Sequence, residues 1–254
     1  HDLGLNYIKV DASFIRRLNK EQNVGLLLPT SNGGAIANLA ALFCGKTVVN
    51  LNYTASATAV QAALTKAGVR TVFTSKRFLE RLRQRGIDPD LLLAGATVYP
   101  LEDFGAQITP LRRALTLLQV VLFPTALLKL LYVTPVARDS VAAILFSSGS
   151  EGSPKGVMLS HRNIVGNIKQ ISDMMNTEEN DVVMSTLPLF HAFGLTGATF
   201  MPLVEGIPVV CHPDPTDAVN IGKAVAEYRG TMLLGTSTFL RLYVRNSRVH
   251  PLMF

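Results

Sequence analysis

Short apolar runs alternate with helix-length segments along the chain from Asn23 onward. The runs have the length and composition of buried strands; they are Val24–Pro29, Thr47–Leu51, Arg70–Ser75 and Ala96–Leu101. Each intervening segment ends in glycine, as helices often do just past their last turn; these segments are Gly33–Gly45, Ser56–Gly68 and Lys76–Gly86. This β-α-β-α order predicts a mostly parallel sheet with helices packed on it.

A second block of the same kind starts at Val141. Its predicted strands are Val141–Ser148, Asp181–Pro188, Pro208–Pro213 and Thr231–Thr236. Predicted helices cover Arg162–Met175, with Ser160 placed to cap the first turn, and Asp217–Tyr228, ended by Gly230. We therefore expect an α/β protein with two similar, mostly parallel sheets and flanking helices. The expected subdomains are residues 23–138 and 139–254, after a lead-in segment 1–22.

The most hydrophobic stretch of the chain, Leu111–Val133, lies between the two blocks. It has the length of a membrane span, but Gln119, Pro124 and Lys129 interrupt it, and a proline kinks or ends a helix. The favoured interpretation is a helix-turn-helix packed on the sheet. A segment lying at a membrane interface, with two adjacent arginines near anionic headgroups, is the main alternative. A transmembrane helix is the least favoured.

Composition and charge limit the class of protein and its partners. With 48% hydrophobic and 17% charged residues, the chain is globular. A net charge of +6 favours anionic partners such as a nucleotide, anionic lipid or an acidic carrier protein. Nucleic acid is not expected as a partner, because the basic residues are scattered and no aromatic-basic motif occurs. Cys44 and Cys211 form no C-x-x-C motif, and no metal site is predicted.

The start of the chain does not continue this pattern. Gly4–Leu18, "GLNYIKVDASFIRRL", resembles the strand and turn of EAL-type cyclic-dinucleotide phosphodiesterases, in which Lys9 would be the functional position. The acidic metal-binding motifs of that family do not follow, so metal-dependent hydrolysis is unsupported. We interpret residues 1–22 as a strand lead-in or a foreign segment, without an activity.

A glycine-rich stretch, "SSGSEGSPKGVMLSH" (Ser147–His161), raises the question of phosphate binding. It is no Walker P-loop, because Lys155 follows a proline and not the second glycine. Gly149, Gly152 and Gly156 would allow positive φ and a close approach of the backbone to a ligand. Serine hydroxyls, loop amides and one lysine are suitable donors for phosphate oxygens. From the residues alone, a phosphate-binding loop and a solvated turn both stay open.

The resemblance to a family favours the phosphate-binding loop. "ILFSSGSEGSPKGVMLSHRNI" resembles the Y-T-S-G-[ST]-T-G-x-P-K-G signature of the adenylate-forming superfamily, in which this loop wraps the triphosphate of ATP. The resemblance implies that Lys155 is catalytic and balances charge as pyrophosphate leaves. It implies these cofactor-binding residues: Ser147, Ser148, Gly149, Ser150, Glu151, Gly152, Lys155 and Gly156. Glu151 stands where threonine is common, and it receives no defined role.

A second motif, "MSTLPLFHAFGLTG" (Met184–Gly197), resembles the superfamily's L-P-[LM]-F-H-x-x-G segment beside the carboxylate substrate. It implies that His191 positions or gates the acyl carboxylate and acts as the second catalytic residue. Three segments together resemble one subgroup of the superfamily, the bacterial bifunctional acyl-[acyl-carrier-protein] synthetase/2-acylglycerophosphoethanolamine acyltransferases. These segments are "SGSEGSPKGV", "LPLFHAFGLT" and "GTSTFL" (Gly235–Leu240).

This subgroup implies an ATP-dependent acid–thiol ligase. A fatty acid would react with ATP to give an acyl-adenylate, and acyl carrier protein or CoA would take the acyl group, linked to lysophospholipid reacylation. The implied location is peripheral, at the cytoplasmic face of the bacterial inner membrane. The alternatives are an acyl-CoA synthetase, another adenylate-forming enzyme that uses an aryl or amino acid, and a non-enzymatic lipid-binding module at a membrane surface.

Several motifs of such a ligase do not occur in the chain. We find no Y-G-x-T-E or Y-x-T-G-D segment and no H-x-x-x-x-D motif of the acyltransferase half. We therefore expect about the first half of the large adenylation domain, nearly inactive alone. The main ligand for Mg²⁺ is expected beyond Phe254.

Overall fold

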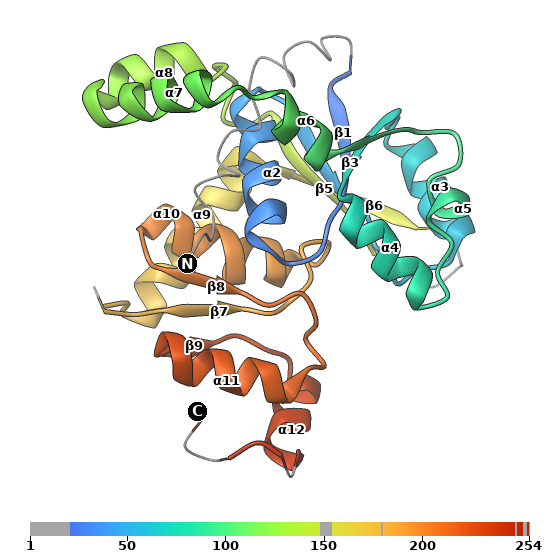
Figure 1. Cartoon of the computed structure of the whole chain (residues 1–254), viewed down its shortest axis with the longest axis vertical. Helices are drawn as coiled ribbons and strands as arrows, with labels where there is room; N and C mark the ends of the chain where they lie inside the picture. The colour runs from blue at the N-terminus through green and yellow to red at the C-terminus, as the bar shows by residue number, and fades with distance from the viewer. Residues whose placement is uncertain (1–20, 148–153, 179, 247, 251–252, 254) are drawn as a thin grey trace. The chain divides into compact units, whose positions relative to one another are not determined.

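The computed structural model describes residues 21–147, 154–178, 180–246, 248–250 and 253 (Figure 1). The chain forms two compact units. The first unit comprises residues 1–28 and 36–161, and the second comprises residues 29–35 and 162–254.

The first unit is built on a six-stranded sheet in the order β4-β3-β1-β2-β5-β6. All neighbours in this sheet are parallel except β5 and β6, which are antiparallel. The strands are β1 (Asn23–Leu27), β2 (Thr47–Asn50), β3 (Thr71–Thr74), β4 (Thr97–Pro100), β5 (Val141–Ser147) and β6 (Lys155–Ser160). The central strands are buried almost throughout, as expected of a parallel sheet covered on both faces.

Helices connect these strands; the first three lie where the sequence predicts them, whereas the two helices between Pro89 and Gln107 were not predicted. They are α2 (Asn32–Phe43), α3 (Ala57–Lys66), α4 (Lys76–Gln84), α5 (Pro89–Leu92), α6 (Leu101–Gln107), α7 (Pro110–Leu122) and α8 (Thr125–Tyr132). Gly45, Gly68 and Gly86 follow the first three helices with φ of 71°, 60° and 77°. The predicted role of these glycines is confirmed, because a left-handed residue after a helix costs glycine nothing.

The hairpin that carries the glycine-rich stretch belongs to the first sheet. Val48 of β2 pairs with Ala143 of β5, and β6 pairs with β5. The predicted subdomain of residues 139–254 would place these strands in the second sheet. In the structure, β5 pairs with β2 of the first sheet instead. A short apolar run does not indicate which distant strand will be its neighbour, so this pairing could not be predicted.

The second unit contains a three-stranded parallel sheet in the order β8-β7-β9. Its strands are β7 (Val183–Ser185), β8 (Val209–Cys211) and β9 (Met232–Leu233). Its helices are α9 (His161–Met175), the π-helix η1 (Phe193–Phe200), α10 (Met201–Glu205), α11 (Ala218–Tyr228) and α12 (Ser237–Arg245). All three strands and both long helices were predicted.

One helix end differs from its prediction. α11 ends through Arg229, which has φ of 53° and is the left-handed residue, in place of the predicted Gly230. Gly230 is required for packing instead, because a Cβ there would lie 2.8 Å from Cγ of Met184. Met184 belongs to the core of this unit, together with Ile221, Val225 and Tyr243.

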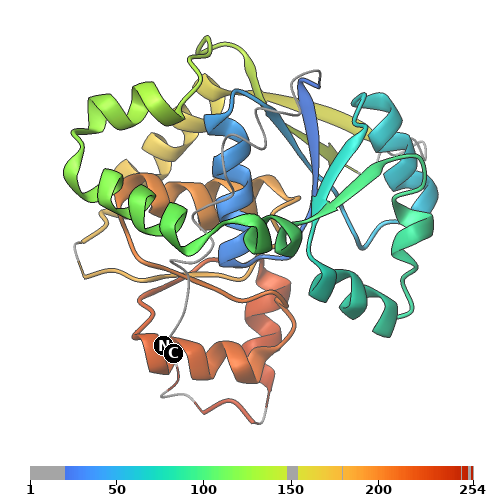
Figure 2. The same ribbon diagram turned by 45° about the horizontal axis from the view of Figure 1, so that its top comes forward.

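The apolar stretch Leu111–Val133 forms α7 and α8, with a break at Phe123 and Pro124. The predicted interruption at Pro124 is confirmed. None of the residues in α7 or α8 is buried, so the expectation that they pack on the sheet is wrong. Both helices project away from the six-stranded sheet (green in Figure 2). No described helix is long and apolar enough to cross a membrane.

Candidate active site

The glycine-rich stretch is the connection of the β5–β6 hairpin. Phe146 pairs with Gly156 and Ser147 with Lys155, so the two ends of the connection lie side by side. Both ends lie at the carboxyl end of β5, the edge of a parallel sheet where ligands usually bind. The predicted residues Ser148, Gly149, Ser150, Glu151 and Gly152 lie outside the described residues.

Gly156 is required for a packing reason that differs from the expected one. It is a strand residue without positive φ, so conformational freedom does not explain it. A Cβ at Gly156 would lie 3.0 Å from the Phe146 ring and 3.3 Å from Cγ2 of Ile144. The ring of Phe146 therefore covers Gly156, which holds the two strands close where the connection begins.

Lys155 starts β6, and its side chain is exposed. The residue before it, Pro154, is buried, and its carbonyl accepts a hydrogen bond of 3.3 Å from Nζ of Lys66. Lys66 is the last residue of α3, where a cation also favours the helix C-terminus. The strand that presents Lys155 is therefore tied to α3 by a side chain that sequence analysis missed.

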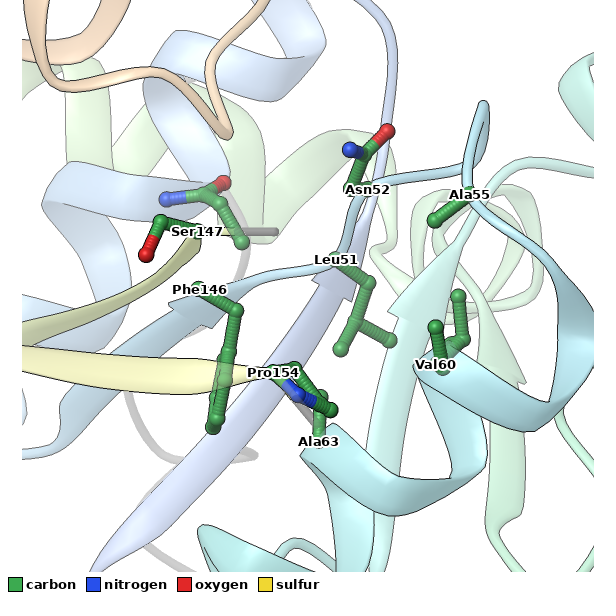
Figure 3. Close-up of a pocket in the computed structure, with 10 residues that line it drawn as sticks. Leu51, Asn52, Ala55, Val60, Ala63, Phe146, Ser147 and Pro154 are labelled. Atoms are coloured by element: carbon green, nitrogen blue, oxygen red, sulfur yellow. The ribbon is translucent and has the colours of Figure 1, made fainter. Parts of the chain in front are cut away.

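A cavity of about 150 Å³ lies beside this hairpin (Figure 3). β2 and the residues after it, helix α3 and both ends of the hairpin contribute side chains. Its lining residues are Asn50, Leu51, Asn52, Ala55, Ala59, Val60, Ala63, Phe146, Ser147 and Pro154. The walls are mainly apolar, and Ser147 contributes a hydroxyl close to the connection.

The amides of this cavity are held in place. Asn50 exchanges two buried hydrogen bonds with Asn38 of α2, at 2.8 and 3.2 Å. Oδ1 of Asn52 accepts from the backbone nitrogen of Thr54 at 2.9 Å. Sequence analysis did not single out Asn50 or Asn52, although their position directly at the end of β2 is a usable signal for a ligand-binding edge.

The second motif surrounds His191 in the second unit. Its backbone nitrogen donates to the carbonyl of Pro188 at 3.1 Å, and its ring lies 4.6 Å from that of Phe190. The carbonyl of Leu187 accepts from Oγ1 of Thr30 at 2.7 Å. The His191 side chain is exposed in part, and burial of the rest lowers its pKa from 6.5. The imidazole is therefore neutral at pH 7.

The glycines of this motif permit close backbone packing. A Cβ at Gly194 would lie 2.2 Å from the carbonyl oxygen of Pro188, and one at Gly197 would lie 2.9 Å from the Phe193 ring. Both glycines belong to the π-helix η1, whose residues from Gly194 to Phe200 are buried. π-Helical turns are rare and occur often at functional sites. The buried π-helix is therefore consistent with a functional role for this segment, but it does not identify a ligand.

Lys155 belongs to the first unit and His191 to the second. The third motif, Gly235–Leu240, joins β9 to α12 in the second unit. The described residues contain no group of three or more His, Cys, Asp or Glu side chains that could hold a metal ion.

The AMP-binding enzyme family matches residues 12–252, nearly the whole chain. The chain belongs to this family. It is 28% identical to sulfoacetate–CoA ligase of Cupriavidus necator over 83% of the chain and 40% of that enzyme. It is 24% identical to a long-chain-fatty-acid–CoA ligase of Salmonella typhimurium over 93% of the chain and 45% of that enzyme. The chain thus spans less than half the length of these relatives.

The fold is shared with solved structures of the superfamily. O-succinylbenzoate coenzyme A synthetase from Bacillus subtilis, in complex with ATP and magnesium ion, superimposes with a TM-score of 0.72 at 17% identity. The match covers 98% of this chain and 46% of the synthetase. The predicted superfamily and its α/β fold are confirmed.

Proposed function

We propose that this chain supplies the phosphate-binding half of an ATP-dependent fatty acid–thiol ligase. The observation that carries the proposal is the β5–β6 hairpin, which presents Ser147 and Lys155 opposite each other at the carboxyl end of a parallel sheet. In the proposed reaction a carboxylate oxygen attacks the α-phosphate of ATP, and pyrophosphate leaves. A thiol then attacks the acyl-adenylate to give a thioester and AMP.

In this proposal the hairpin acts electrostatically. A carboxylate is already a nucleophile, so the first step needs little acid–base chemistry. The exposed Lys155 would offset the charge that develops as pyrophosphate leaves, together with Ser147 and the predicted loop residues Ser148 to Gly152. Loss of one well-placed donor costs about 3 kcal/mol of barrier in comparable anion sites. Lys66 would be a positioning residue, because it holds the carbonyl next to Lys155.

His191 would orient the acyl carboxylate. Because its pKa is lowered, the ring carries one N–H at pH 7 and can donate to a carboxylate without neutralising it. We expect the adenylation rate to fall as the pH drops through the lowered pKa of His191, which lies below 6.5. A His191→Gln variant should be slower and lack this acidic step in its pH profile. An identical profile in the variant would remove His191 from the mechanism.

Mg²⁺ is implied by the family, but the described residues contain no group of three or more His, Cys, Asp or Glu side chains that could hold it.

The substrate and acceptor are proposed from the subgroup motifs. They favour a fatty acid and acyl carrier protein, linked to lysophospholipid reacylation at the cytoplasmic face of the bacterial inner membrane. The matched CoA ligases favour the second candidate, an acyl-CoA synthetase. The net charge of +6 supports an acidic acceptor without distinguishing the two.

One experiment tests both the class and the acceptor. The full-length protein is incubated with ATP, Mg²⁺ and radiolabelled palmitate, and hydroxylamine traps the acyl-adenylate. Acyl carrier protein and CoA are then supplied separately. We expect hydroxamate that depends on Lys155, and faster thioester formation with the carrier protein. Hydroxamate unaffected by Lys155→Ala would contradict the assigned loop, and faster transfer to CoA would select the second candidate.

A further inference from the structure

The α7–α8 segment (Pro110–Tyr132) exposes an unusual amount of apolar surface. Ten of its large aliphatic side chains are at least 36% exposed, with values up to 71% for Val121 and 79% for Leu130. They are Leu111, Leu115, Leu117, Leu118, Val120, Val121, Leu122, Leu127, Leu130 and Leu131. A group of exposed aliphatic side chains of this size marks an interaction site, whereas single exposed leucines need no explanation.

A polar contact joins the two helices, and many of their aliphatic side chains are exposed. The hydroxyl of Tyr132 in α8 donates a hydrogen bond to Oε1 of Gln119 in α7. Helical spacing places Gln119 on the same side of α7 as Arg112 and Thr116. Leu111, Leu115, Leu118 and Leu122 recur at the helical period on another side, which solvent reaches. A helix pair that packs on a protein core would instead bury its aliphatic side and expose its polar side.

The charged residues within this stretch of the sequence have one sign. Between Asp103 and Asp139 the sequence contains four basic residues, Arg112, Arg113, Lys129 and Arg138, and no acidic residue. Two copies meeting through this surface would bring these like charges together, whereas an anionic surface would be attracted to them. With 13 residues in α7 and 8 in α8, neither helix is long enough to span a bilayer.

We propose that the α7–α8 segment lies in the interface of an anionic phospholipid membrane, with the leucine side of α7 among the acyl chains. The combination of an amphipathic helix, basic residues and short length is typical of interfacial helices. This inference is independent of the proposed ATP-binding loop. If both are correct, the enzyme would meet its fatty acid at the surface in which that acid dissolves.

Tryptophan fluorescence tests the insertion directly, because the chain contains no tryptophan. Leu118→Trp places a fluorophore on the leucine side of α7. Val244→Trp is the matched control, at an apolar position of α12 that is 88% exposed. Vesicles containing 30% phosphatidylglycerol should shift the Leu118→Trp emission to shorter wavelength, and brominated lipid should quench it, with neither effect for Val244→Trp. Absence of both effects for Leu118→Trp would overturn the proposal.

Vesicle flotation tests the charge requirement with the native apolar surface intact. Arg112→Ala/Arg113→Ala should bind anionic vesicles about 30-fold more weakly, since each basic residue near such a surface contributes about fivefold. Arg77→Ala/Arg81→Ala on α4 is the charge-matched control and should bind like the parent. Equal binding of all three proteins would contradict the proposal. Dimerisation that Leu118→Glu abolishes, without vesicle binding, would also contradict it and assign the surface to a second copy.

Discussion

Strand β5 and helix α7 are both rich in aliphatic residues, yet they differ in burial. Ala142, Ala143, Ile144 and Leu145 of β5 are all buried. No residue of α7 is buried. Aliphatic content and periodicity therefore predict that an element forms, but they do not identify what covers it.

The difference comes from the neighbours of each element. β5 is paired on both sides, with β2 and β6, and its pairing with β6 continues to Ser147 at the candidate site. The polar side of α7 contacts α8, where Gln119 accepts a hydrogen bond from the hydroxyl of Tyr132. Strand pairing on both sides thus makes β5 the stem of the hairpin, whereas the leucines of α7 are exposed.

The largest expected effect is a difference in stability between alanine variants of two leucines. Leu145→Ala in β5 removes a side chain that is 6% exposed and should lower the free energy of unfolding by about 2–4 kcal/mol. Leu118→Ala in α7, which is 53% exposed, should change it by less than about 0.5 kcal/mol. Urea unfolding followed by circular dichroism measures both. Similar losses for the two variants would mean that α7 is covered within the folded chain.

The next largest effect is a difference in stability between alanine variants of two glycines. Gly156→Ala forces the Phe146 ring to move and should cost about 1–3 kcal/mol. Gly166→Ala is the control, because no heavy atom lies within 4 Å of the added Cβ in α9, and alanine favours a helix by about 0.5–1 kcal/mol. Thermal unfolding should therefore show shifts of opposite sign. A stabilised Gly156→Ala variant would contradict the packing assigned to the stem.

The smallest effect concerns the attachment of the stem to α3. Lys66→Met keeps most of the side-chain length and removes one hydrogen bond, to the carbonyl of Pro154. We expect the KM for ATP to rise about three- to tenfold, corresponding to about 0.5–1.5 kcal/mol, with kcat and the melting temperature little changed. Lys223→Met on α11 is the control and should leave KM unchanged. An unchanged KM for Lys66→Met would mean that α3 does not position the hairpin.

Much of the fold could be predicted from the sequence, because local signals agreed with one another. The strands at Val24, Thr47 and Thr71 follow from short apolar runs, and the helix ends at Gly45, Gly68 and Gly86 follow from glycine. These features depend only on neighbouring residues. The superfamily could also be predicted, because its motifs occupy contiguous stretches.

Features that depend on distant residues could not be predicted. Nothing in the run Val141–Ser147 indicates that β2 will be its neighbour. The hydrogen bond from Lys66 to Pro154 joins residues 88 positions apart. Gly156 was expected to need a positive φ, but the structure gives it a different role, which is to make room for the Phe146 ring. The exposure of α7 was not predicted, because the hydrophobic pattern of a helix is the same whether protein or lipid covers its apolar side.

Binding of inorganic tripolyphosphate, measured by isothermal titration calorimetry, tests the central claim most directly, because it isolates the hairpin from the adenine and acyl sites. Lys155→Ala should weaken this binding at least tenfold, corresponding to about 1.4 kcal/mol or more, as expected for loss of a hydrogen bond to a charged group. Lys169→Ala, at an exposed position of α9, should bind like the parent. Equal dissociation constants for the parent and Lys155→Ala would show that the β5–β6 hairpin does not hold a polyphosphate.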